Sequence, residues 1–229
     1  MPAIVIAHED RPAAPWVLPD GSGWDQRLVQ DAARDAGLEI AYRALPWQRC
    51  LEAAGCGELD GVLAVSYRSE RCQFLAYPLT ADGRPDVAAS LHTDSYAIYR
   101  RADRLLQPTD RVAAQRGFAV VEQLAELGIA ADEFDDDAAG LLARLAGGEV
   151  AAAALLTVVA DQLIALRPEW QHALTREARV FSARPYYLAF ARAFYEAQPE
   201  PCSRLWQAIR ARRSGGARPP RRRARRISR

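Results

Sequence analysis

The feature that most constrains the fold is a set of uninterrupted apolar runs separated by helical patterns. Residues 61–65 (Gly-Val-Leu-Ala-Val) form one such run, and residues 3–7 and 150–155 form two more. A strand that is apolar on both sides has to be covered on both sides, as in a parallel sheet between helices. Apolar residues at helical spacing lie between the runs, for example over residues 28–36. The sequence therefore predicts an α/β fold.

The elements fall into two blocks of similar size. In the first block we expect strands at 3–7, 39–45 and 61–65 and helices at 28–36 and 46–54. In the second we expect strands at 96–99, 111–115 and 150–155, helices at 118–127, 141–145 and 158–166, and an acidic loop at 132–137. An extended segment at 184–190 and an amphipathic helix at 203–212 follow. The chain therefore has two α/β units.

Charge is distributed unevenly along the chain. All 30 cationic side chains are arginines, and ten of them lie between residues 210 and 229. Every acidic residue lies at or before Glu200, so the body is acidic and the end is basic. Residues 214–229 combine arginines with Gly and Pro pairs, which predicts a disordered basic tail. Several interpretations of this tail remain open. It could bind nucleic acid or an anionic membrane surface, be a solvated appendage without a role, or result from a late reading-frame change. Because the tail lacks aromatic residues for base stacking, we do not expect nucleic-acid binding.

Several classes of protein are excluded or disfavoured. No apolar run reaches the 18 residues of a membrane-spanning helix, and the longest candidate is 150–160. The amino terminus shows no targeting segment, which predicts a cytoplasmic protein or a mature or truncated form. The four cysteines include no CxxC pair, so we expect buried thiols, with a disulfide as the alternative, and no metal. His8, His92 and His172 are scattered, which indicates structural roles, and no cofactor is expected.

Four segments in this order carry a resemblance to a known family. They are LPWQRCLEAAGCGELDGVLAVSYRSERCQFLAYP (45–78), AAQRGFAVVEQLAELG (113–128), LLARLAGGEVAAAA (141–154) and RPYYLAFARAF (184–194). Together they resemble the bacterial extracellular solute-binding proteins of family 3, the periplasmic receptors of polar amino-acid uptake systems and their relatives. The resemblance covers about residues 3–212, and the first segment is the most specific.

The resemblance implies a two-lobed fold of the type 2 periplasmic-binding-protein class, with a ligand cleft between the lobes. Lobe 1 would be discontinuous, formed by residues 1–95 and 185–213, and lobe 2 would span residues 96–184. The implied function is that of a non-catalytic receptor that closes around a small polar solute, an amino acid or a related carboxylate. It also implies a periplasmic location, a membrane permease of the ABC type as partner, and a monomer.

The first lobe offers an anion site after its apolar strand. Ser66, Tyr67 and Arg71 follow the strand that ends at Val65, and ligands of open α/β sheets bind beyond the carboxyl ends of strands. A guanidinium is a planar fork of donors that fits a carboxylate. The resemblance implies that Arg71 binds the ligand's carboxylate. The alternative is a surface ion pair of Arg71 with Glu70 or Asp60.

Further candidates lie at Gly117, Phe118 and Trp16. Gly117 and Phe118 occupy a strand-to-helix turn, where free N–H groups attract anions, although an ordinary turn has the same pattern. The resemblance implies a ring against the ligand at Trp16. The rings of Trp16 and Tyr67 fit either the cleft or the core. For Trp47 and Tyr77 we expect core packing.

One departure from the family concerns the ligand's ammonium. Receptors of this family usually place an acidic residue after the strand of the 148–150 region, and here that position falls at about Leu156, with Thr157 and Asp161 as the nearest polar side chains. An apolar side chain cannot compensate a buried ammonium. Either the ligand is not an ordinary α-amino acid, or Glu9 or Asp10 substitutes from the first lobe.

Two other functions remain open. Some relatives on this fold are dehydratases, and a lyase would need an acid or base such as Glu9 or His8 in the cleft. The sequence shows no convincing nucleophile–base pair, metal cluster or phosphate loop. A detached ligand-sensing module is the other alternative.

Overall fold

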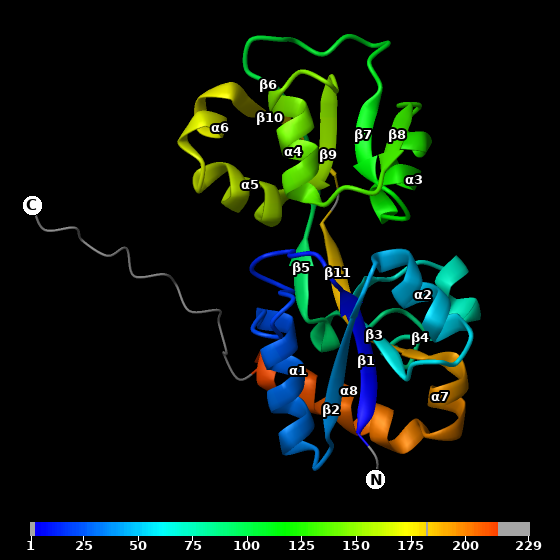
Figure 1. Cartoon of the computed structure of the whole chain (residues 1–229). Coiled ribbons are helices and arrows are strands. Elements are labelled where there is room, and N and C mark those ends of the chain that lie inside the picture. The colour runs from blue at the N-terminus through cyan, green and yellow to red at the C-terminus, as the bar shows by residue number, and fades with distance from the viewer. Residues whose placement is uncertain (1–2, 182, 215–229) are drawn as a thin grey trace, which may run out of the picture.

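The computed structural model describes residues 3–181 and 183–214, which form two sheets, each flanked by helices (Figure 1). The first sheet contains β1 (Ile4–Glu9), β2 (Ile40–Leu45), β3 (Gly61–Ser66), β4 (Leu75–Ala76), β5 (His92–Asp94) and β11 (Arg184–Ala191). The second contains β6 (Tyr96–Arg101), β7 (Val112–Gln115), β8 (Ala131–Phe134), β9 (Ala152–Leu156) and β10 (Leu174–Val180). We call the two units lobe 1 and lobe 2. We propose the boundaries predicted above, with lobe 1 formed by residues 1–95 and 185–213 and lobe 2 by residues 96–184.

Lobe 1 has a parallel centre and an antiparallel edge. Its strand order is β2-β1-β3-β11-β4; β1 runs parallel to β2 and β3, and β11 runs antiparallel to β3. The flanking helices are α1 (Trp24–Asp35), α2 (Trp47–Gly55), α7 (Arg192–Ala197) and α8 (Pro199–Ser214), with the short 3-10 turns η1 (Glu70–Gln73) and η2 (Val87–Ala89). The α8 helix packs against α1, where Arg212 Nε lies 2.6 Å from Asp35 Oδ2. The end of the chain thereby completes the lobe in which it begins.

Lobe 2 is built in the same way. Its strand order is β10-β6-β9-β7-β8; β7 is parallel to β8 and β9, and β6 is antiparallel to β9 and β10. Its helices are α3 (Ala119–Glu126), α4 (Ala138–Ala146), α5 (Thr157–Ala165) and α6 (Pro168–Ala173). The carboxyl ends of β7 and β9 face lobe 1, as those of β1 and β3 face lobe 2 (Figure 1).

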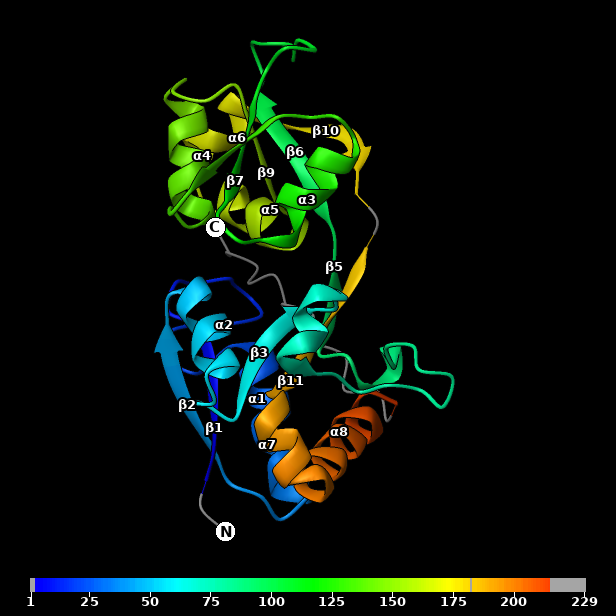
Figure 2. The same ribbon diagram turned by 90° about the vertical axis from the view of Figure 1, so that its right-hand side faces the viewer.

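The chain passes between the lobes at β5–β6 and again at β10–β11. The β5 and β11 strands lie side by side at this crossing (Figure 2), and they pair antiparallel with Tyr186 opposite His92. Tyr186 also lies opposite Ser66 of β3. Because laterally paired residues point to the same side of a sheet, Ser66, Tyr186 and His92 form a row beside the crossing.

The apolar runs are covered on both sides, as the sequence predicts. Along β3, Leu63 belongs to the cluster that contains Ile4, Ile6 and Trp206, whereas Val62 and Val65 belong to the cluster on the other side of the sheet. Lobe 2 has its own cluster around Tyr99, Leu141 and Leu155. Each lobe therefore has its own core, and the lobe 2 cluster also reaches Tyr186, Ala13 and Trp16 of lobe 1.

Three expectations are corrected. Residues 132–137 are not only a loop, because β8 covers 131–134. Among the described strands β8 pairs only with β7, so it is the edge of the sheet, where charged side chains reach solvent. The last helix is longer than 203–212, and Ser214, assigned to the tail, is its last residue; 215–229 lie outside the described residues. All four thiols are free, as expected, but Cys56 is exposed and Cys72 only half-buried.

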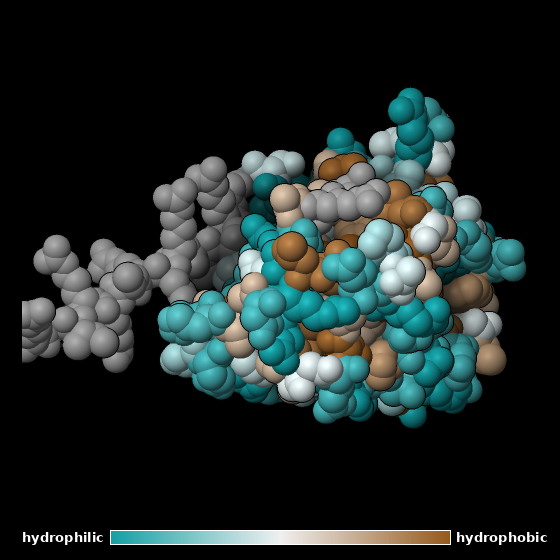
Figure 3. All heavy atoms as spheres, turned by 90° about the horizontal axis from the view of Figure 1, so that it is seen from above, coloured by the Kyte–Doolittle hydropathy of each residue, from teal (hydrophilic) through white to brown (hydrophobic). Residues whose placement is uncertain are grey.

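The face of the molecule seen from above lobe 2 is mostly hydrophilic. Viewed from above lobe 2, hydrophobic atoms occur in groups interrupted by hydrophilic side chains (Figure 3). Within residues 3–181 and 183–214, no helix combines the length and apolar character needed to cross a membrane.

Candidate functional site

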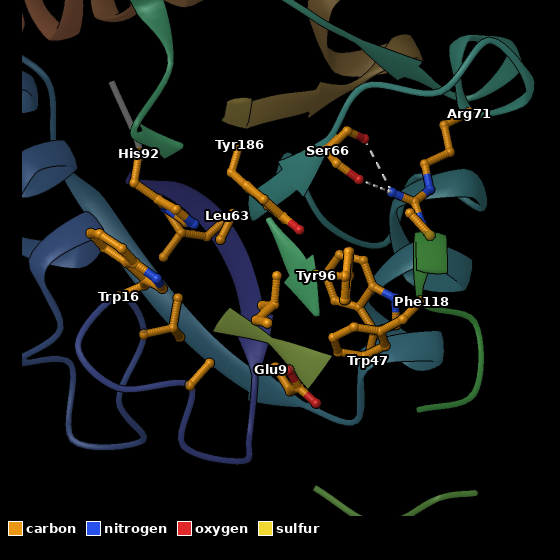
Figure 4. Close-up of a pocket in the computed structure, with 15 residues that line it drawn as sticks. Glu9, Trp16, Trp47, Leu63, Ser66, Arg71, His92, Tyr96, Phe118 and Tyr186 are labelled. Atoms are coloured by element: carbon orange, nitrogen blue, oxygen red, sulfur yellow. Dashed lines mark hydrogen bonds between the residues drawn. The ribbon is translucent and has the colours of Figure 1, made fainter. Parts of the chain in front are cut away.

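A cavity of about 50 Å³ lies between the lobes at the carboxyl ends of their strands. Side chains from both lobes line it: Glu9, Ala13, Trp16, Val17, Trp47, Leu63, Ala64, Ser66, Arg71, His92, Tyr96, Phe118, Ala119, Leu156 and Tyr186. Figure 4 shows Arg71 and Ser66 on one side, Trp16 and His92 on the other, and Tyr186 between them. A volume of this size holds only a few water molecules, so the lobes must separate to admit a larger solute.

Arg71 is buried without a negatively charged partner. Only 6% of the residue is exposed; Nη1 donates to Ser66 O (3.1 Å) and Ser66 Oγ (3.3 Å), and Nη2 donates to Gly117 O (3.4 Å). Burial lowers the pKa of the guanidinium. No carboxylate of the described residues forms an ion pair with it: Glu70 lies 3.5 Å from Arg68 instead, and Asp60 accepts from Val5 N. The alternative of a surface ion pair is therefore wrong.

Contacts across the cleft converge on the turn before α3. The Gly117 carbonyl accepts from Arg71 and also from Trp47 Nε1 at 3.3 Å. Gly117 has a φ of +74°, and its N–H donates to Glu133 Oε2 at 3.1 Å. The turn thus directs a carbonyl, not the expected Gly117 N–H, toward lobe 1. Nearby, Arg68 and Glu122 form an ion pair of 2.8 Å between the lobes.

The acidic side chain of the cavity is Glu9. It is half-buried at the end of β1, and burial, followed by the charge of Asp10, raises its pKa to about 8. Leu156, at the end of β9, presents an apolar side chain from lobe 2. Asp161 does not line the cavity; it accepts from Tyr99 Oη at 2.8 Å and pairs with Arg176 at 2.6 Å. Of the two substitutes considered above, Glu9 faces the cavity, whereas Asp10 is exposed outside it.

Three stacked rings form a wall that runs from the side opposite Arg71 to the middle of the cavity. His92 lies between Trp16 and Tyr186, with centroid distances of 4.1 and 4.6 Å and interplanar angles of 4° and 8°. His92 Nδ1 lies 2.7 Å from Oδ2 of the buried Asp25. His92 Nε2 and the Tyr186 hydroxyl are buried and have no hydrogen-bond partner among the described residues. This wall therefore combines flat apolar faces with two unsatisfied polar atoms.

Several known structures have the same architecture. A histidine kinase sensor domain similar to periplasmic binding proteins matches with a TM-score of 0.75 and 21% identity, covering 93% of this chain and 91% of that one. The arginine-, lysine-, histidine-binding protein ArtJ from Geobacillus stearothermophilus matches with 0.75 and 15%, covering 94% and 91%. The GluR0 ligand-binding core from Nostoc punctiforme, in complex with L-glutamate, matches with 0.73 and 17%, covering 94% of each chain.

The chain has the two-lobed fold of periplasmic binding proteins. No family model and no curated protein matches its sequence. At these identities the similar structures establish the fold and not the ligand.

Within this two-lobed fold, the cavity brings together most of the predicted site residues. Arg71, Ser66, Trp16, Phe118 and Glu9 line it, and Gly117 contacts Arg71 through its carbonyl.

The structure does not bring Tyr67 to the cavity. Its ring packs edge-on against Tyr77 at 5.2 Å and lines a separate groove of lobe 1 with Cys72 and Arg192. Tyr77 is buried in the core, as expected. Trp47, expected in the core, instead lines the cleft, because the start of α2 faces lobe 2.

Sequence reasoning missed His92, Tyr96 and Tyr186 as cavity residues. His92 and Tyr186 belong to β5 and β11, and Tyr96 begins β6 directly after the first crossing. The one available signal was their position beside the crossings between lobes; no motif marks them. Among the residues that the structure describes, no group of three or more His, Cys, Asp or Glu side chains could hold a metal ion.

Proposed function

We propose that the protein is a non-catalytic receptor that closes its two lobes around a small solute carrying a carboxylate, an amino acid or a related acid. The observation that carries the proposal is the buried guanidinium of Arg71, which has only neutral acceptors. A buried charge without a counter-charge is costly, and a bound carboxylate would supply that charge through a two-donor contact.

The position of Glu9 supports an amino acid in particular. Glu9 and Arg71 line the same cavity, and Trp47 and Phe118 lie between them in Figure 4. The ammonium of a bound amino acid beside Glu9 would favour the ionised form of the Glu9 carboxyl group, which burial disfavours. A zwitterion would then be held at one end by each residue.

We further propose membership of the solute-binding proteins of family 3, a periplasmic location, and delivery of the solute by the monomeric closed form to an ABC-type permease. The four sequence segments and the shared fold support this role. The fold also occurs in the kinase sensor domain, so a ligand-sensing module is the second candidate. Fractionation of the native host separates periplasm from cytoplasm. Co-purification of a permease would favour uptake over sensing.

Titration calorimetry with the amino acids and their decarboxylated amines tests the binding function. We expect at least one amino acid to bind and its amine to fail, with Arg71→Ala abolishing binding. Arg192→Ala is the matched control, because Arg192 also donates to neutral carbonyls of lobe 1, at Cys72 and Leu75, but lies outside the cavity. Small-angle scattering should show a smaller radius of gyration with the bound amino acid. Binding that survives Arg71→Ala, or an unchanged scattering profile, would contradict the proposal.

The rival class is an enzyme on the same fold. The Asp25–His92 pair is its best candidate, because a carboxylate orients the imidazole and leaves Nε2 unpartnered toward a ligand site. His8, considered above, does not line the cavity. An NMR spectrum of the bound solute after prolonged incubation decides between them: an unchanged solute supports the receptor, and a converted one supports the enzyme.

A further inference from the structure

We propose that His92 Nε2 and the Tyr186 hydroxyl form a specificity subsite that binds a side-chain carboxamide or hydroxyl of the ligand. This rests on the proposed function, because it names the side chain of the solute whose carboxylate Arg71 holds. His92 lies on the opposite side of the cavity from Arg71, and Tyr186 lies between them (Figure 4).

The first argument is the lack of partners at both atoms. His92 and Tyr186 are 4% and 6% exposed, both line the cavity, and neither polar atom has a partner of hydrogen-bond geometry among the described residues, although the Tyr96 side chain lies close to the Tyr186 hydroxyl. Most buried polar atoms of native proteins are hydrogen-bonded, and an unsatisfied one costs about 1–3 kcal/mol. Two such atoms on one wall of a ligand cavity indicate a partner that comes with the ligand.

The second argument is that the chemistry of the two atoms is defined. His92 Nδ1 lies 2.7 Å from Asp25 Oδ2, so one proton is shared between these two atoms and Nε2 is the ring nitrogen left for a ligand. Nε2 accepts a hydrogen bond when the ring is neutral and donates one when the ring is protonated. Burial, and then the neighbouring Tyr96 hydroxyl, raises the pKa of Tyr186, so its hydroxyl keeps its proton and donates. A group that both donates and accepts satisfies both atoms, and carboxamides and hydroxyls do so.

The third argument is that the subsite is rigid. Trp16 and Tyr186 cover the two faces of the imidazole, which leaves only the ring edge for a ligand. Trp16 is fixed by its own hydrogen bond from Nε1 to Asp94 Oδ2, at 3.2 Å. The strand pairing places Tyr186 directly opposite both His92 and Ser66, so the subsite and the Arg71 anchor belong to one row of side chains. A preorganised subsite of this kind gives specificity at low entropic cost.

Two pairs of near-isosteric amino acids test the inference: asparagine against leucine, and glutamine against methionine. In each pair the first member carries a carboxamide and the second does not. We expect the wild-type protein to prefer the amide by about tenfold in at least one pair. Tyr186→Phe, which removes only the hydroxyl, should reduce that preference to about twofold or less while leaving the apolar member's affinity unchanged.

Tyr187→Phe is the matched control. The Tyr187 hydroxyl is also buried and without a partner, on the same strand, but Tyr187 does not line the cavity. Neither variant should lower the thermal midpoint, because neither hydroxyl donates a bond within the described structure. The amide preference should survive Tyr187→Phe unchanged.

The outcomes separate the two proposals. If amino acids bind but no pair shows an amide preference, or if Tyr186→Phe leaves the preference intact, the subsite is wrong and the receptor stands. If neither these four nor any other amino acid or related carboxylate binds, the receptor is wrong and the subsite with it.

Discussion

Arg71 Nη2 lies 3.4 Å from the carbonyl oxygen of Gly117 and donates a hydrogen bond to it across the cleft. The same carbonyl accepts from Trp47 Nε1, so one peptide group of lobe 2 binds two side chains of lobe 1. The residue proposed to hold the ligand's carboxylate therefore also contacts the opposite lobe. In the proposed receptor this side chain would couple ligand binding to lobe closure, so that the ligand binds the closed form more tightly than the open form.

Arg71→Lys should weaken amino-acid binding by about 10- to 100-fold while keeping the positive charge. A lysine ammonium cannot donate in parallel to a carboxylate while holding Ser66 and Gly117, and a charge-assisted hydrogen bond is worth about 1.5–3 kcal/mol. Titration calorimetry measures the change. The control variant Arg192→Lys, whose substitution lies outside the cavity, should bind the amino acid as tightly as the wild type does. Equal affinities of the wild type and Arg71→Lys would contradict the proposed two-donor contact.

Gly117→Ala should weaken ligand binding through backbone strain. Gly117 has a φ of +74°, which an L-residue disfavours, whereas an added Cβ would make only ordinary van der Waals contacts with Gln48 and Trp47, at 3.4 to 3.7 Å. Relief of this strain would move the carbonyl that accepts from Arg71 and Trp47, and titration calorimetry measures the resulting loss of affinity.

Gly128→Ala is the control for backbone strain. Gly128 also lies in lobe 2 with a φ of +70°, and a Cβ there meets nothing within 4 Å. Both variants should lose about 1–2 kcal/mol of stability, because L-residues disfavour this conformation. Only Gly117→Ala should lower the ligand affinity, because only Gly117 contacts Arg71; an equal loss of affinity in both variants would show that the position of the Gly117 carbonyl is not responsible.

Glu9→Gln should flatten the pH dependence of stability. Burial raises the pKa of Glu9 to about 8 in the folded protein, whereas an unfolded glutamate titrates near 4.5. Between these values the folded state binds more protons than the unfolded state, so Glu9 lowers the free energy of unfolding as pH rises through this window. The thermal midpoint of Glu9→Gln should match the wild type near pH 4 and exceed it near pH 8. The exposed Glu126→Gln should show no such difference; if it does, Glu9 is not the source.

Amino-acid binding near pH 7 should release protons. An ammonium beside Glu9 favours the ionised carboxylate, so a group that is largely protonated without ligand loses its proton on binding. Calorimetry in two buffers with different ionisation enthalpies measures the release. The release should disappear in Glu9→Gln and with a carboxylic acid that lacks the amino group. Release that persists in Glu9→Gln would place the titrating group elsewhere.

Much of the fold could be predicted from local pattern. The continuous apolar run of β3 required cover on both sides, and its residues are indeed divided between two clusters of lobe 1. The prediction failed where a strand had no apolar signal: β8 carries acidic residues because it is an exposed edge, and its strand conformation depends on pairing with β7. The two short strands β4 and β5 depend in the same way on pairing with β11.

Part of the candidate site could likewise be predicted from local order, and part could not. From the sequence one could predict that Ser66 and Arg71 follow a strand that ends at Val65, and this local order places a cation at the edge of the sheet. The three-dimensional structure was needed to show that His92 and Tyr186, which are 94 residues apart in the sequence, pair across β5 and β11 and stack on one another. It was also needed to show that Trp47 contacts Gly117 whereas Tyr67 lies outside the cavity. Periodicity predicts which side of a helix or strand is buried, because the residues of that side recur at a regular spacing within the same element. Which distant side chains share a cavity depends on how two separately formed lobes are joined, and no local pattern carries that information.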